Sequence, residues 1–87
     1  MKKKDVRILL VDDEPDILEI VGYNLSQEGY QILTASNGKE AIAKAKKDLP
    51  HLIIMDVMMP EMDGMEACEQ IRKMPELSQV IITFLTA

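Results

Sequence analysis

The chain has 87 residues, of which 47% are hydrophobic and 29% charged, with a net charge of -5. These fractions are typical of a soluble globular protein, and the length allows a single small domain, residues 1–87, without a linker. No apolar run approaches the roughly 20 residues that span a bilayer, and no basic stripe is present, so we expect neither membrane nor nucleic-acid binding by this segment. The single cysteine excludes an internal disulfide, and we expect a cytoplasmic protein.

The first third of the chain predicts a strand, a helix and a second strand. The apolar run Val6–Val11 is typical of a parallel strand covered on both faces, and Asp12 follows it directly. Residues 13–15 (DEP) then predict a helix start with a short acidic cap and proline in the first turn, and Gly29 ends that helix. Gln31–Ala35 is a strand whose mixed polarity favours a sheet edge.

The middle of the chain predicts a second helix and a third strand. The Asn37-Gly38 pair turns the chain into a second helix, which Pro50 closes. Leu52–Met55 is then a third, wholly apolar strand, and it leads directly to Asp56.

The last third predicts a helix and a strand. Asp63 and Glu66 have the three-residue spacing of a capping box, with aspartate as the cap of a third helix. Residues 76–79 form a loop, and Val80–Leu85 is a fourth strand that is apolar on both faces and is followed by Thr86.

Strands that alternate with helices predict an α/β fold with a parallel sheet and right-handed crossovers. In such sheets the ligand site lies at the carboxyl ends of the strands, and here those ends carry Asp12, Asp13, Asp56 and Thr86. Clustered carboxylates repel one another unless a cation relieves them, and a hard cation such as Mg²⁺ prefers their oxygens. The residues therefore predict a Mg²⁺ site at this edge, although Asp12 and Asp13 could also act only as first-turn acids of the helix.

These residues resemble the receiver domain of two-component response regulators. The resemblance extends along all 87 residues and rests on the following positions: Asp12-Asp13, Asp56, Pro60, Asp63-Gly64 and Thr86-Ala87. It implies a flavodoxin-like parallel sheet of strand order 2-1-3-4, with the fifth strand and last helices missing from this chain.

The resemblance also implies a chemistry for the acidic edge. Asp56 is expected to be the phosphoacceptor, which takes a phosphoryl group from the phosphohistidine of a histidine kinase. Mg²⁺ is expected on Asp13, Asp56 and the backbone carbonyl of Met58, with Asp12 bound directly or through water, and Thr86 is expected to contact the phosphate. Structural roles are implied for three residues of the following loop: Pro60, Asp63 and Gly64.

The chain departs from the family pattern at its end. A complete receiver carries a lysine after its fifth strand, and this sequence stops at Ala87, so we expect a truncated or engineered fragment. The fourth strand, Val80 to Leu85, would then be an uncovered hydrophobic edge, which favours self-association or a borrowed complement.

Two other functions stay open. Without the lysine, the chain could be a structural or interaction half-domain that lacks phosphotransfer. It could also be a Mg²⁺-dependent phosphatase with an aspartate nucleophile, of the haloacid dehalogenase type, but such enzymes need a second aspartate where this chain has Met58. A receiver is not ordinarily classed as an enzyme, and we expect none here.

Overall fold

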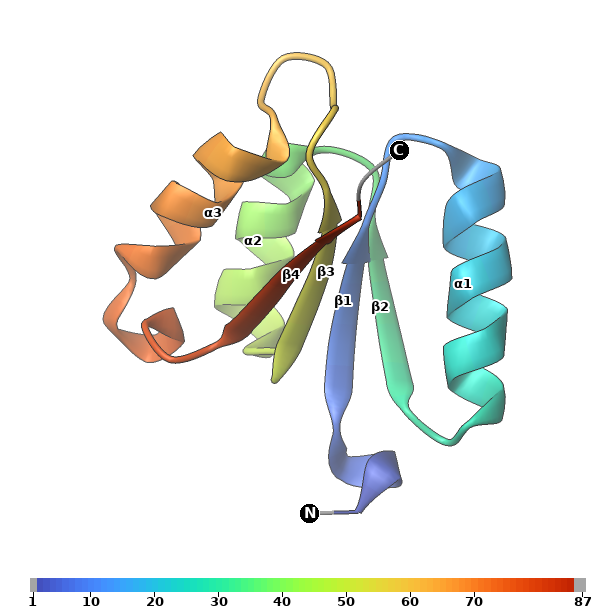
Figure 1. The fold of residues 1–87 in the computed structure, drawn as a ribbon. Coiled ribbons are helices and arrows are strands. Elements are labelled where there is room, and N and C mark those ends of the chain that lie inside the picture. The colour runs from blue at the N-terminus through green and yellow to red at the C-terminus, as the bar shows by residue number, and fades with distance from the viewer. Residues whose placement is uncertain (1, 86–87) are drawn as a thin grey trace.

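The computed structural model describes residues 2–85. Four strands alternate with three α-helices, and two short 3-10 helices, η1 and η2, precede the first and last strands (Figure 1). The elements are, in chain order, η1 (Lys3–Asp5), β1 (Arg7–Val11), α1 (Pro15–Gln27), β2 (Gln31–Ala35), α2 (Gly38–Asp48), β3 (Leu52–Asp56), α3 (Gly64–Arg72), η2 (Pro75–Leu77) and β4 (Ile81–Leu85).

The strands form one parallel sheet in the order β2-β1-β3-β4, as the sequence predicts. Helix α1 lies on one side of the sheet and α2 and α3 on the other, so that the two central strands are covered on both faces (Figure 1). This arrangement explains the continuous apolar run of β1, because no position of a strand covered on both faces points to water.

The core is built on the central strands. Leu9 and Val11 of β1 and Ile53 and Met55 of β3 are fully buried. Helices α2 and α3 contact this core mainly through alanines, and small side chains let the helices approach the sheet closely. The buried residues are Ala41, Ala45 and Ala67, together with the larger Ile71. Close packing of this kind fixes the position at which each strand ends, and therefore the position of the acidic edge.

Some local details differ from the expectations. β1 starts at Arg7 and not at Val6, because the N–H of Val6 donates to the carbonyl of Lys3 in η1 at 3.0 Å. The residue that caps α1 is Glu14, and its side chain makes no capping hydrogen bond, so the prediction of a short acidic cap is wrong. Pro15 does lie in the first turn, and Gly29 follows the helix with a φ of 105°, as expected.

β4 is an edge strand of the sheet formed by residues 2–85. One of its faces packs on the core through Ile82 and Phe84, whereas the other exposes Ile81, which is 65% accessible. The expected hydrophobic edge is therefore present in the described part of the chain. No helix within that part is long and apolar enough to cross a membrane.

Candidate functional site

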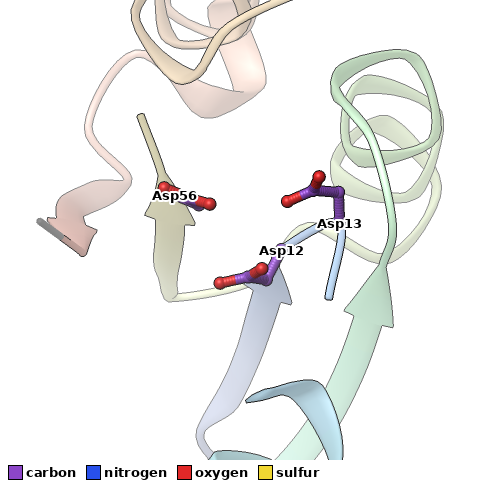
Figure 2. A group of neighbouring side chains, drawn as sticks. All are labelled: Asp12, Asp13 and Asp56. Carbon is purple, nitrogen blue, oxygen red and sulfur yellow. The ribbon is translucent and has the colours of Figure 1, made fainter. Parts of the chain in front are cut away.

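Three aspartates come together at the carboxyl edge of the sheet. Asp12 and Asp13 follow β1, and Asp56 is the last residue of the neighbouring β3, one position beyond the Val11–Met55 pair of the register. Each aspartate offers a carboxylate oxygen, and these oxygens all lie within 4.8 Å of one another (Figure 2). The predicted convergence of the three carboxylates is confirmed.

Asp12 is held from two directions. Its carboxylate Oδ1 accepts the backbone N–H of Glu14 at 2.9 Å, and its own N–H donates to the carbonyl of Ala35 at 3.1 Å. The first bond takes up the backbone N–H of Glu14, the residue that caps α1. The side chain of Asp12 is buried, whereas Asp13 is exposed.

Asp56 is half-buried and oriented by the loop that follows it. Its Oδ1 accepts the backbone N–H of Met58 at 3.0 Å, which turns the chain sharply away from β3. Because this bond uses one carboxylate oxygen, the other remains available to a ligand. The side chain of Met58 points to solvent and is 75% exposed.

The loop from β3 to α3 closes on Gly64. The N–H of Gly64 donates to the carbonyl of Val57 at 3.0 Å, and a Cβ on Gly64 would lie only 2.4 Å from the carbonyl oxygen of Asp56. Glycine is therefore required by the close approach of the strand end. Asp63 caps α3 by accepting the N–H of Glu66 at 2.8 Å, as the capping-box spacing predicts, and Pro60 lies exposed in the loop.

The electrostatics of the cluster favour a cation. Burial raises the pKa of Asp12, the N–H of Glu14 opposes that effect, and the charges of Asp56 and Asp13 raise the pKa further. Three carboxylates that repel one another, with an exposed side where water can complete a coordination shell, form a donor set that fits a hard divalent ion. The residues present thus fit Mg²⁺.

Replacing Asp12 with asparagine is expected to stabilise the metal-free protein at neutral pH and to have less effect in acid. The pKa of Asp12 is raised in the folded state, so the folded protein holds this proton more tightly than the unfolded chain. The free energy of unfolding therefore falls as pH rises from the ordinary aspartate pKa through the raised value. Asparagine removes this dependence, and its side-chain oxygen can still accept the backbone N–H of Glu14. Urea unfolding at a series of pH values, in a chelator, measures the difference, and a difference that does not change with pH would contradict the prediction.

The structure leaves the predicted role of Thr86 untested and adds two contacts of Asp12 that the sequence did not predict. Thr86 lies outside the described residues, so its contact with a phosphate stays a prediction. The supports of Asp12, namely the N–H of Glu14 and the carbonyl of Ala35, were missed by sequence reasoning. An aspartate two residues before Glu14 is a signal for the first contact, because such side chains often bond the N–H two residues on. The second depends on how β1 and β2 pair.

A parallel 2-1-3-4 sheet with an acidic cluster at its carboxyl edge defines a flavodoxin-like α/β protein whose site suits a divalent cation and an oxyanion. The family model of the response regulator receiver domain matches residues 8–87. The chain belongs to this family, the receivers of two-component signalling.

Named relatives and solved structures agree. The chain is 49% identical over 67 residues to the alkaline phosphatase synthesis transcriptional regulatory protein PhoP of Bacillus subtilis, an alignment that covers 77% of this chain and 28% of PhoP. It is 40% identical over 85 residues to the probable transcriptional regulator ycf27 of Pyropia yezoensis, covering 98% of this chain and 35% of the relative. The chain thus spans about a third of the length of the curated relatives that it matches.

Among solved structures, the N-terminal domain of a response regulator receiver protein from Methanoculleus marisnigri JR1 superposes with a TM-score of 0.89 at 36% identity, over 93% of this chain and 66% of that one. The response regulator TrrA from Thermotoga maritima, solved in complex with Mg(2+)-BeF, superposes with a TM-score of 0.87 at 44% identity, over 94% of this chain and 70% of that one. The predicted family and fold are confirmed.

Proposed function

We propose that this chain is the phosphoacceptor segment of a two-component response regulator and that Asp56 takes the phosphoryl group from a histidine kinase. The observation that carries the proposal is the cluster of three carboxylates within 4.8 Å at the ends of β1 and β3, in a chain of the receiver family. In the transfer, a carboxylate oxygen of Asp56 forms a bond to phosphorus. The nitrogen–phosphorus bond of the phosphohistidine breaks, and the imidazole leaves.

The proposed ligands of Mg²⁺ are Asp13, Asp56 and the backbone carbonyl of Met58, with Asp12 bound directly or through water. Bound there, the ion would supply positive charge against the phosphoryl oxygens, which is the main demand of phosphoryl transfer. The chain's own part is orientation, since the N–H of Met58 holds one oxygen of Asp56 and Glu14 holds one oxygen of Asp12. The relative TrrA, solved with Mg(2+)-BeF, supports this assignment.

The remaining assignments of the proposal concern residues around this centre. Thr86 would donate its hydroxyl to a phosphate oxygen. Asp63 and Gly64 shape the loop, one by capping α3 and the other by admitting the backbone of Asp56. Methionine at position 58 can act neither as an acid nor as a base, so the sequence does not favour the phosphatase alternative. The longer relatives are named as transcriptional regulators, and we propose that this segment serves a regulator of that kind.

The experiment is intact-mass spectrometry after incubation with a small phosphodonor and Mg²⁺. We expect one phosphoryl adduct per chain, located at Asp56 by peptide mapping, and none when a chelator removes the metal. The sample must be shown to be folded by circular dichroism. No adduct in a folded sample would reject the proposal and favour the interaction half-domain.

We further propose that the edge of β4, which has no neighbouring strand among residues 2–85, pairs with the same edge of a second copy. The edge is hydrophobic, with Ile81 65% exposed, and unpaired strands of this kind favour edge-to-edge association. We expect a dimer in sedimentation at high concentration, and a monomer after replacement of the exposed Thr83 with lysine, a charge that blunts strand edges. A wild type that stays monomeric would contradict this proposal.

A further inference from the structure

The loop of residues 57–63 carries the Met58 carbonyl and follows Asp56 directly, yet its own hydrogen bonds tie it only locally. Those bonds join Met58 to Asp56, Met62 to Pro60, and Gly64 to Val57, and Asp63 accepts two N–H groups of the adjoining helix α3. Among the described residues, no hydrogen bond connects residues 57–62 to α2 or to β1. The loop rises above the sheet between β3 and α3 (Figure 1), so its position depends on side-chain packing.

One residue of the loop is strained. Glu61 has a φ of 68°, in the left-handed region that side chains other than glycine rarely adopt. Such a conformation persists where the surrounding structure holds it. The residue that follows it, Met62, is partly buried and packs against the core.

The side chain of Met62 fills the place where a side chain on Gly38 would be. A Cβ on Gly38 would lie 2.9 Å from both Cγ and Sδ of Met62 and 3.0 Å from its Cβ. Gly38 is the first residue of α2, is buried and has no positive φ. Its lack of a side chain therefore serves the contact with Met62, not an unusual backbone conformation.

The start of α2 is itself firmly placed. Asn37 caps the helix by accepting the N–H of Glu40 at 2.8 Å. Two residues earlier, the carbonyl of Ala35 accepts the N–H of Asp12 at 3.1 Å. The turn from β2 to α2 thus touches Asp12 at one end and the loop at the other.

We infer that Gly38 and Met62 are positioning residues: their contact fixes the loop after Asp56 relative to Asp12, and so sets the geometry of the acidic cluster. Neither residue touches the carboxylates. The effect on phosphorylation rests on the proposed function, whereas the effect on the loop does not. If Gly38 served only the formation of α2, alanine would stabilise the protein and leave the loop unchanged, because alanine is the better helix former.

The test compares Gly38→Ala with Gly22→Ala. Gly22 is a buried helical glycine of α1 where an added Cβ would meet Ile32 and Leu10 at an ordinary 3.7 Å. In metal-free protein, we expect Gly38→Ala to speed hydrogen exchange of the Met58 and Gly64 amides by about fivefold or more relative to Gly22→Ala. We also expect phosphorylation by a small donor to slow by about tenfold, since small misplacements of reacting groups are costly.

Met62→Ala provides a second variant that adds no atoms. It should speed exchange of the same amides. The double variant Gly38→Ala/Met62→Ala should resemble Met62→Ala alone, because the two nearest atoms, Cγ and Sδ, are gone and only the Cβ at 3.0 Å remains. Unchanged amides in both single variants would overturn the inference. So would loop amides that change only in step with global unfolding in urea.

The two proposals fail in different ways. If the wild type takes no phosphoryl group, the proposed function fails, and the exchange of the loop amides still decides the role of Gly38 and Met62. If the wild type is phosphorylated and Gly38→Ala is phosphorylated equally fast with unchanged amides, the inference alone fails.

Discussion

Replacing Gly64 with alanine is expected to lower the free energy of unfolding by about 3 kcal/mol, the range of severe overpacking. The new Cβ would lie 2.4 Å from the carbonyl oxygen of Asp56 and 3.0 Å from Cα of Val57. Both are backbone atoms, so no side-chain rotation relieves the clash. Either the end of β3 or the start of α3 must move, and the first movement displaces Asp56.

Urea unfolding followed by circular dichroism measures this loss, with Gly22→Ala as the matched control. At Gly22 the same methyl group meets its neighbours at 3.7 Å, and alanine in a helix favours folding, so this variant should be neutral or slightly stabilising. Equal stability of the two variants would mean that the junction of β3 and α3 moves freely. The close approach of Gly64 to Asp56 would then have no energetic weight.

The sheet order as a whole came from the family resemblance, and the strand patterns predicted only part of it. The apolar runs in β1 and β3 identify central strands, and the mixed polarity of β2 identifies an edge, as observed. The edge position of β4 could not follow from its own pattern, which is apolar except for Thr83. It followed from the family resemblance and is confirmed for the described residues.

The acidic cluster could be predicted because parallel strands place their carboxyl ends at one edge. The sequence could not predict that Asp12 is buried and Asp13 exposed. The direction of each side chain depends on how the chain turns after the strand. Here the N–H of Glu14 draws Asp12 inward. The acidic cap expected for α1 is absent, because the side chain of Glu14 accepts no N–H of the helix.

Contacts between distant segments could not be predicted from the sequence, for a different reason. The N–H of Arg7 donates to Nδ1 of His51 at 3.0 Å across 44 residues, and Met62 meets Gly38. Each contact depends on the register of paired strands or on the exact height of a helix. Hydrophobic periodicity reports neither, because it describes one element at a time.

Asp56→Asn is expected to have two opposite effects. Phosphorylation should be lost, because the amide is no nucleophile for phosphorus. The metal-free protein should become more stable by about 1 kcal/mol, since one of three repelling charges disappears while an oxygen remains for the N–H of Met58. The same charges that serve the site therefore cost stability when no cation is bound.

Mg²⁺ should reverse the order of stability. Binding to the folded state alone adds about 2.7 kcal/mol at one hundred times the dissociation constant, and the variant forfeits most of this. Wild type and variant are compared by urea unfolding with chelator and with saturating Mg²⁺, and by intact mass with a small phosphodonor. The two stability curves should cross as Mg²⁺ is added.

Asp63→Asn is the matched control for this experiment. It removes an exposed charge near the start of α3, and asparagine caps a helix as well as aspartate does, so adduct formation and the gain from Mg²⁺ should stay as in the wild type. A variant Asp56→Asn that still gains stability from Mg²⁺ would place the ion away from Asp56. An adduct retained in that variant would place the phosphoryl group elsewhere, and the carboxylates at the ends of β1 and β3 would then be an acidic edge without the proposed chemistry.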